Sequence, residues 1–346
     1  MTSHAAEMAP VPAIPHRPGR HCGSSAIRDL LEFHGTTLTE AMCFGLGSGL
    51  GITYLTLPDA PVPFLVHVRS LGYEERVFQA LDVPFAWTSY GSVEEGAQAL
   101  DSLLDQGRPA LLLTDIFHLP YFASRTHFPG HAIMAWQRQP ADGCILVTDT
   151  ERPAPISVAR AALARARFAE LPPFFHAGNL FAPPAIHTRL SVERVAAAIR
   201  HNARLLLEGG PYTGVAALDT WQADLGRWER EGDWRWTTRF AYQIIERRGT
   251  GGGGFRKMYA EFLEEAASAD PRISELQLPQ LMTGCARCWT ALALALKAGS
   301  ESECFPTELL ADALQAVRDG RIANAASIIA LQWLALNRVE VRGLWS

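Results

Sequence analysis

The sequence has no long run of basic residues, no apolar segment of membrane-spanning length and few cysteines. Only 19% of the 346 residues are charged and the net charge is −5 at pH 7, so nucleic acid is not expected as a partner. The longest apolar stretch, Trp289 to Leu296, is far too short to cross a bilayer, and no membrane partner is expected. Six cysteines in a chain of this length do not form a disulfide scaffold. Reduced thiols in a cytoplasmic protein are the simpler interpretation.

The first residues also lack the features of a signal peptide. Residues 1–14 are rich in alanine and proline, and they contain no basic segment followed by an apolar core. We therefore expect residues 1–15 to be a disordered leader. Apolar residues make up 48% of the chain, which is typical of a globular protein with a sizeable core.

The secondary-structure pattern changes near residue 175. Before this point, short apolar or alternating segments that predict strands are mixed with helices. Beyond it, nearly every segment has helical periodicity. We expect an α+β catalytic domain over residues 16–175 and an all-α domain over residues 176–346. The helices expected in the second domain are Val192–Leu207, Val215–Arg230, Arg235–Arg247, Phe255–Ala267, Leu281–Lys297, Thr307–Arg318 and Ile322–Leu336.

One cysteine lies where a helix is expected to begin. After the break at Pro18-Gly19, the apolar residues Ile27, Leu30 and Leu31 have helical spacing, which places Cys22 at or just before the first turn. Unpaired backbone N–H groups and the positive end of the helix dipole favour a thiolate there, and the thiolate is the nucleophilic form. The alternative is that Cys22 is a small buried residue at a helix start, a common place for cysteine.

A second pattern predicts a β-hairpin that carries a histidine and an acid. His131 to Gln137 and Cys144 to Thr148 are both strand-like, and a turn cluster separates them. If the turn is centred on residues 140–141, His131 faces position 150 and lies within about one residue of Asp149. A carboxylate can orient an imidazole at that separation.

This pair supplies the base and its orienting acid, which are two members of a catalytic triad. Cys22 would be the nucleophile, His131 would take the thiol proton and return it to the leaving group, and Asp149 would fix the imidazole tautomer. Considered singly, His131 is better explained as the start of a buried strand and Asp149 as a turn residue. Their combination on one hairpin, downstream of a cysteine at a helix start, favours catalysis.

These features together resemble the papain-like thiol fold, and the Cys-His-Asp version is similar to bacteriocin-leader peptidases. More narrowly, about the first 170 residues resemble the N-terminal domain of the butirosin-type acyltransferases. The remainder resembles the helical domain of unknown role that is often fused to it. The runs that carry the resemblance are His21–Ser25, Phe44–Gly51, Gly130–Ala132, Val147–Asp149 and Gly251–Tyr259 with Phe262 and Leu263.

The resemblance implies a papain-like cysteine-protease-type N-terminal domain followed by an all-α C-terminal domain. It also implies acyl transfer in specialised-metabolite biosynthesis, such as aminoglycoside tailoring. The thioester donor would be an acyl carrier protein phosphopantetheine or acyl-CoA, and a small-molecule amine would be the acceptor. We expect no permanently bound cofactor and no metal, and we consider a homodimer. A cysteine peptidase or amidase of the same fold and a catalytically silent binding module remain alternatives.

The oxyanion hole is less well defined. Papain-like enzymes usually have a glutamine shortly before the cysteine, and none precedes Cys22. The Cys22 and Gly23 amides at the helix start could supply donors, and His16, Arg20 or His21 could add another.

Two glycine-rich segments are further candidates for substrate binding. The loop with Gly47 and Gly49 could admit a pantetheine arm or a phosphate, although a plain turn is the stronger alternative. Gly252 and Gly253 open an expected helix with Arg256 in its first turn, which predicts an anion site, while a disordered surface loop fits equally well.

Two other groups of residues are interpreted as structural. Cys285 and Cys288 form a lone C-x-x-C pair on an apolar helix, and two buried thiols are the default interpretation. His118 and His127 could act as a reserve base, but surface loop histidines are the simpler expectation.

Overall fold

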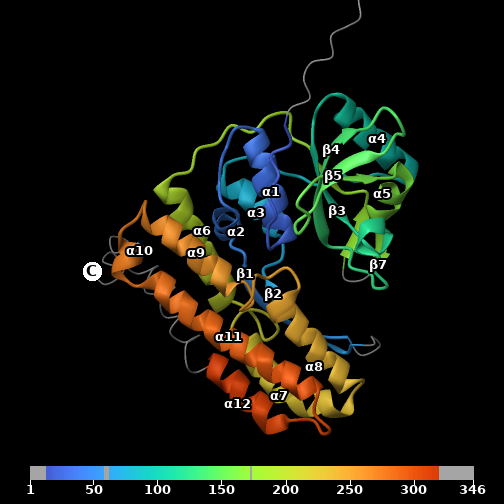
Figure 1. The fold of residues 1–346 in the computed structure, drawn as a ribbon. Coiled ribbons are helices and arrows are strands. Elements are labelled where there is room, and N and C mark those ends of the chain that lie inside the picture. Colours follow the sequence, from blue (N-terminus) through green and yellow to red (C-terminus); the bar gives the residue numbers. More distant parts are fainter. Residues whose placement is uncertain (1–12, 58–61, 172–173, 319–346) are drawn as a thin grey trace, which may run out of the picture. The chain divides into compact units, whose positions relative to one another are not determined.

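The computed structural model describes residues 13–57, 62–171 and 174–318 (Figure 1). Most of the expected leader and the helix expected at Ile322–Leu336 therefore lie outside the described residues. Helix α1, Cys22–Phe33, begins at the candidate nucleophile, and Gly35 follows it with φ +84°, as expected for a helix terminator.

Two compact units are present, and they interleave along the sequence. Unit 1 contains the described residues up to Pro18 together with 29–35 and 88–185, whereas unit 2 contains 19–28, 36–87 and the described residues from 186 onward. The domain boundary expected near residue 175 stays a prediction, because grouping by contacts does not define sequence domains.

Unit 1 is built on a five-stranded antiparallel sheet with strand order β6-β5-β4-β3-β9. Leu112, Ile133, Val147 and Leu163 belong to its buried core. Helix α4 follows Ser92, whose hydroxyl caps it by accepting the Glu95 amide. The elements of this unit are α4 (Val93–Asp105), β3 (Ala110–Thr114), η1 (Ile116–His118), η2 (Pro120–Phe122), β4 (His131–Arg138), β5 (Ile145–Thr148), β6 (Ile156–Val158), α5 (Arg160–Ala166), β7 (Phe168–Leu171), β8 (Phe174–Ala177) and β9 (Leu180–Phe181).

The expected hairpin is confirmed as β4 and β5, but its register differs from the prediction. Met134 pairs with Thr148, so three residues earlier His131 lies level with residue 151 rather than 150. A bulge at Trp136, between Ala135 and Gln137, shifts the register within the hairpin. The Trp136 indole donates to the Thr148 hydroxyl at 2.8 Å, which anchors the bulge across the pair.

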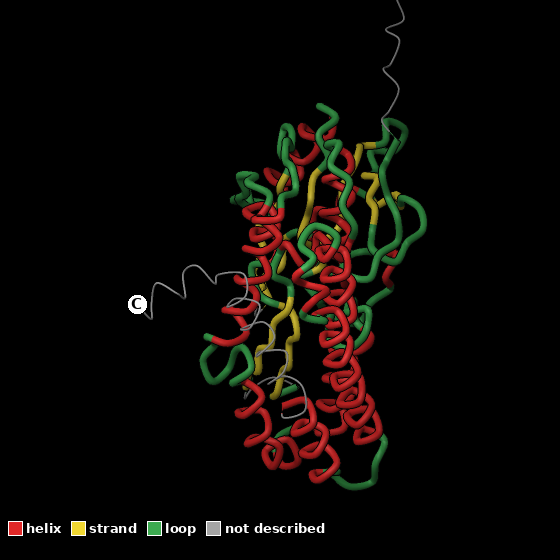
Figure 2. The backbone as a smooth tube through the Cα atoms, turned by 90° about the vertical axis from the view of Figure 1, so that its left-hand side faces the viewer, coloured by secondary structure: helices red, strands yellow, loops and turns green. Residues whose placement is uncertain are grey.

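Unit 2 is mostly helical, with a two-stranded antiparallel ribbon among the helices (Figure 2). Long helix α11 packs against α8, α9 and α12. The expected helix Val192–Leu207 has those bounds, and Arg235–Arg247 divides into an α-helix and a π-helix. The elements of this unit, besides the first part of α1, are α2 (Glu40–Leu46), β1 (Leu50–Thr56), β2 (Phe64–Arg69), α3 (Tyr73–Ala80), α6 (Val192–Leu207), α7 (Ala217–Arg230), α8 (Trp234–Tyr242), η3 (Gln243–Arg247), α9 (Arg256–Ala267), α10 (Arg272–Glu275), α11 (Leu278–Ser300) and α12 (Thr307–Val317).

The fold class is thus mixed α+β, with antiparallel sheets and helices in the N-terminal region and mostly helices in the C-terminal region. None of the helices in the described part of the chain is both long enough and apolar enough to span a bilayer.

Candidate active site

Cys22 is the first residue of α1, and its thiol is half-buried. The cap of this helix is the preceding histidine: the Ser24 amide donates to His21 Nδ1 at 3.1 Å. An imidazole thus takes the place of the Ser, Thr, Asp or Asn side chain that commonly accepts this bond. The first-turn amides and the helix dipole favour negative charge at this end, which is where the Cys22 sulfur lies.

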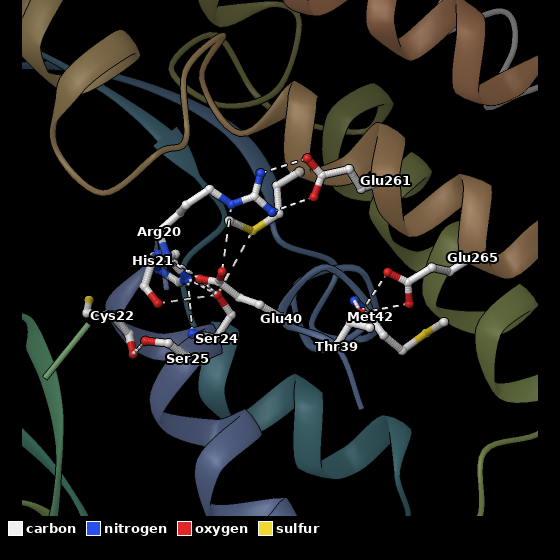
Figure 3. Close-up of polar contacts among 11 residues, drawn as sticks. Arg20, His21, Cys22, Ser24, Ser25, Thr39, Glu40, Met42, Glu261 and Glu265 are labelled. Carbon is white, nitrogen blue, oxygen red and sulfur yellow. Dashed lines mark hydrogen bonds and ion pairs between the residues drawn. The ribbon is translucent and has the colours of Figure 1, made fainter. Parts of the chain in front are cut away.

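A buried carboxylate fixes the backbone directly before Cys22. Glu40 Oε1 accepts the amides of Arg20 and His21, each at 2.8 Å, and the Ser24 hydroxyl donates to the same oxygen at 3.3 Å (Figure 3). Glu40 is the first residue of α2, so the amide end of that helix favours its negative charge. Glu40 was not among the expected site residues, because an acid after a capping threonine is ordinary at a helix start.

His21 is enclosed by aromatic rings. Its ring lies edge-on to Tyr73, Phe255 and Phe44, with centroid distances of 5.2, 5.1 and 5.8 Å. Only 3% of His21 is exposed. Its observed contacts therefore support helix capping, and its suggested role as an oxyanion donor stays a prediction.

Arg20 is held by helix α9 from the C-terminal part of the chain. Its guanidinium donates to both carboxylate oxygens of Glu261, one of them at 2.7 Å, and it lies 3.7 Å from Glu40. The hydrogen bond that Arg20 donates to Glu261 raises the pKa of Arg20 in spite of its partial burial. Thr39 likewise donates to Glu265 of α9 (Figure 3). The surroundings of Cys22 are thus built from both ends of the chain within unit 2.

The glycines near the nucleophile are closely surrounded by side chains. A Cβ atom at Gly47 would lie 2.4 Å from the Tyr73 ring, and one at Gly49 would lie 2.5 Å from Phe44. At Gly23 it would lie 3.0 Å from Glu74. These contacts give each glycine a packing reason, and the expected binding of a substrate arm at Gly47 and Gly49 stays a prediction.

The second glycine-rich segment is a left-handed turn whose amides are already bonded. Gly252 donates to the Thr250 hydroxyl, Gly253 to Glu246 and Gly254 to the Ile245 carbonyl. These internal bonds argue against the anion site expected at Gly252 and Gly253, which stays a prediction.

Arg256, expected to assist that anion site, is buried. It donates to the carbonyls of Gly254 and Gly51, and its guanidinium lies over Trp289 at 4.2 Å. Burial lowers the pKa of Arg256 to about 9. Its contacts join the glycine turn to strand β1 and helix α11.

In unit 1, His131 and Asp149 are hydrogen-bonded side chains. His131 Nε2 lies 2.9 Å from both carboxylate oxygens of Asp149. The carboxylate also accepts the Tyr121 hydroxyl at 2.7 Å and the Thr150 amide at 2.6 Å. Because a carboxylate can only accept, Nε2 carries the proton in this pair. The predicted orientation of a histidine by an acid on the next strand is therefore present.

Several groups keep Asp149 ionised. Burial alone would raise its pKa, but the His131 charge and the hydrogen bonds from His131, Tyr121 and Thr150 together lower it. Burial and the neighbouring Asp149 charge raise the pKa of Tyr121, so its hydroxyl stays a donor. Tyr121 was not among the expected site residues, because its contact with Asp149 joins positions 28 residues apart.

Aromatic and basic side chains surround this pair. The Phe122 ring lies edge-on to His131 with a centroid distance of 5.1 Å. Arg152 stacks over Tyr121 and Phe122 and donates to the Tyr121 carbonyl at 2.9 Å.

His16, suggested as an oxyanion donor, lies between two acceptors in unit 1. Its Nδ1 is 2.7 Å from Asp29, and its Nε2 is 2.7 Å from the Arg152 carbonyl. Both ring nitrogens are thus engaged in structural contacts.

The structure brings His131 and Asp149 together in unit 1, whereas Cys22 belongs to unit 2. All six cysteines are free thiols, with Cys285 buried and Cys288 half-buried on α11. The triad as a whole stays a prediction.

The comparisons with known proteins agree with the resemblance found in the sequence. Residues 21–150, which include Cys22, His131 and Asp149, match the family model "Butirosin biosynthesis protein H, N-terminal". Residues 161–320 match a "Domain of unknown function (DUF4872)". No curated protein matches the chain. The chain therefore carries the N-terminal domain of the butirosin biosynthesis protein H family, followed by this domain of unknown function.

Proposed function

We propose that this protein is a cysteine acyltransferase of papain-like fold that moves an acyl group from a thioester to an amine in specialised-metabolite biosynthesis. The observation that carries the proposal is the His131–Asp149 pair, held by Tyr121, in a domain whose family is named for butirosin biosynthesis. The half-buried Cys22 thiol at the start of α1 is the proposed nucleophile.

The proposed reaction has two steps. His131 takes the Cys22 proton at Nδ1, and the thiolate attacks the thioester carbonyl. The tetrahedral intermediate then collapses to an acyl-enzyme and expels the donor thiolate. This thiolate takes up the proton from the His131 imidazolium and departs as a thiol. The acceptor amine then attacks the acyl-enzyme carbonyl and gives its proton to His131, which returns it to the departing Cys22 sulfur. Asp149 stabilises the imidazolium in both steps.

The Cys22 and Gly23 amides at the start of α1 are the proposed oxyanion donors. The Arg20 guanidinium is less suited to this role, because Glu261 and Glu40 already engage it. His21 acts in the proposal by capping α1 and orienting those amides.

The proposed donor is an acyl thioester of phosphopantetheine, on an acyl carrier protein or in acyl-CoA, and the proposed acceptor is a small-molecule amine. The cytoplasm, where such thioesters are made, is the proposed location.

Intact mass after incubation with short acyl-pantetheine thioesters tests the nucleophile. We expect one acyl adduct on the unmodified protein, the same adduct on Cys288→Ala and none on Cys22→Ala. Cys288 is a matched control because its thiol is also half-buried. Full turnover by Cys22→Ala would reject the proposal, and hydrolysis of peptides by the purified protein would favour the peptidase alternative.

The partnership between Cys22 and His131 needs its own test. We expect His131→Ala to slow acyl-enzyme formation by about 10²–10⁴-fold, as for loss of a general base. If Cys22 and His131 act in the same step, the double variant with both Cys22→Ala and His131→Ala will turn over no more slowly than Cys22→Ala alone. An unchanged rate in His131→Ala would show that this histidine does not activate Cys22. An iodoacetamide rate that is slow at neutral pH and rises with pH at an ordinary thiol pKa would favour the silent binding module.

A further inference from the structure

The loop between β3 and β4 begins with a buried aspartate whose orientation is fixed. Asp115 follows β3 directly and is 1% exposed. Its Oδ1 accepts the Phe117 amide at 3.1 Å and the Phe128 amide at 2.9 Å, while its Oδ2 lies 2.6 Å from His127 Nδ1. One carboxylate oxygen is thus used by backbone amides, and the other faces imidazole.

Two histidines from opposite ends of the loop lie near this carboxylate. His118 ends η1, His127 precedes β4, and their ring centroids are 5.9 Å apart. One ligand atom from each of Asp115, His118 and His127 can be chosen so that all three lie within 4.8 Å of one another. In the described part of the chain, His118 makes ring contacts with Phe117 and His127 but no hydrogen bond through its ring nitrogens.

This set of donors suits a particular class of ion. Two imidazole nitrogens and one carboxylate oxygen are ligands of Zn²⁺ and related divalent transition metals, whereas Mg²⁺ and Ca²⁺ prefer all-oxygen sites. The amides on Oδ1 act as the outer hydrogen bonds that orient a ligating carboxylate. The His127 side chain is 43% exposed, so the ion has a path from solvent.

We propose that Asp115, His118 and His127 form a binding site for a divalent transition-metal ion of the zinc class. The ion takes the place of the proton between His127 and Asp115. A ring nitrogen of His118 also binds the ion. Three protein ligands leave a fourth position for water. His118 and His127 were expected to be ordinary surface loop histidines, and Asp115 was not among the expected site residues.

The position of the site gives the ion a structural consequence. The segment that it closes, residues 116–127, carries Tyr121 and Phe122, which contact Asp149 and His131. A bound ion would tether the two ends of this segment to each other and restrict the motion of those two side chains. The metal site itself does not depend on the proposed acyl transfer.

Titration calorimetry with Zn²⁺ on the full chain, purified without a histidine tag, tests the site. We expect one equivalent to bind, and we expect His118→Ala and His127→Ala each to weaken binding by at least about tenfold. His187→Ala is the control, because His187 is also an exposed histidine. Both histidines lie at or near the surface, so we expect both variants to fold. Circular dichroism checks this.

Two results would overturn the proposal. One is the absence of a saturable equivalent, and the other is binding that persists unchanged in both histidine variants, which would locate the ion elsewhere. Co²⁺ distinguishes the chemistry: bound at this site it gives visible ligand-field bands without the near-ultraviolet thiolate band that a cysteine site would give. A thiolate band lost on Cys288→Ala would assign the ion to the C-x-x-C pair instead.

Discussion

Tyr121 is the residue whose hydroxyl keeps Asp149 in place beside His131. Removing it in Tyr121→Phe leaves a buried carboxylate with one donor fewer, which we expect to lower the free energy of unfolding by about 1–3 kcal/mol at neutral pH. The bond is made to the ionised acid and helps to lower its pKa. Its contribution is therefore present above the unfolded carboxyl pKa of about 4 and is lost as the pH falls through the lower folded pKa.

Urea unfolding at a series of pH values checks this sign. The difference between Tyr121→Phe and the unmodified protein is expected to shrink in acid. Tyr212→Phe serves as control, since Tyr212 is 52% exposed. A loss that stays constant with pH would show that the hydroxyl stabilises the fold by some route other than the Asp149 charge.

Glu40 has a comparable role for the backbone before Cys22. Glu40→Ala leaves the Arg20 and His21 amides without their acceptor, and we expect it to cost about 2–4 kcal/mol in the free energy of unfolding. Glu40→Gln keeps one accepting oxygen and should cost clearly less. Thermal and urea unfolding of the two variants give the comparison, and equal losses would assign the effect to the charge alone.

At the scale of elements, the glycine turn before α9 depends on a backbone shape that other residues avoid. Residues 251 to 255 all have positive φ, from 56° to 85°, and the last of them is Phe255. Phe255 is held in this strained shape by His21 and by a stacked Phe44 ring at 4.9 Å. The turn therefore places an aromatic ring against the residue that caps α1.

Alanine substitutions should act with opposite signs at two glycines of unit 2. At Gly253, φ is +60° and a Cβ atom would lie 2.9 Å from the Ala286 carbonyl, so Gly253→Ala should cost about 2 kcal/mol or more. Gly226 lies inside α7, where a Cβ atom would lie 3.5 Å from the Arg230 guanidinium, an ordinary contact, so Gly226→Ala should stabilise by up to about 1 kcal/mol. Urea midpoints measure both, and a stabilising Gly253→Ala would contradict the strained geometry.

The sequence predicts local elements better than the contacts between them. Helix Val192–Leu207 and the β4–β5 hairpin follow from periodicity and turn residues, which act over a few positions. The hairpin register was wrong because the turn is centred one residue later than expected, so that Arg138 pairs with Ile145. Glu40 and Tyr121 were missed for a related reason: their partners Arg20 and Asp149 lie 20 and 28 positions away. Their contacts appear only once the elements have packed.

At the scale of the whole molecule, unit 2 contains residues from both of the regions that the two family models match. The ribbon strand β1 places Tyr54 where its hydroxyl accepts the Trp228 indole at 2.9 Å, and Phe64 of β2 stacks on the same indole at 5.7 Å. Trp228 belongs to α7, in the region matched by the domain of unknown function. The N-terminal family domain therefore lacks part of its core when it stands alone.

A fragment that ends at Ala185 tests this dependence. We expect it to expose the apolar faces around Tyr54 and Phe64, to bind a hydrophobic dye and to lose cooperative unfolding. Cys22 in the fragment should react with iodoacetamide like a thiol in an unfolded peptide. A fragment with native-like Cys22 reactivity would show that the helical part is dispensable for the nucleophile.

The run of left-handed glycines has a consequence for chemical synthesis of the protein. Positive φ is the ordinary range of a D-amino acid, whose side chain leaves Cα on the side opposite to that of an L-residue. A D-alanine placed at Gly251, where the turn is exposed, should therefore stiffen the chain in its observed shape, while L-alanine at the same position should work against it. Mirror-image residues could thus lock the segment that presses Phe255 onto His21.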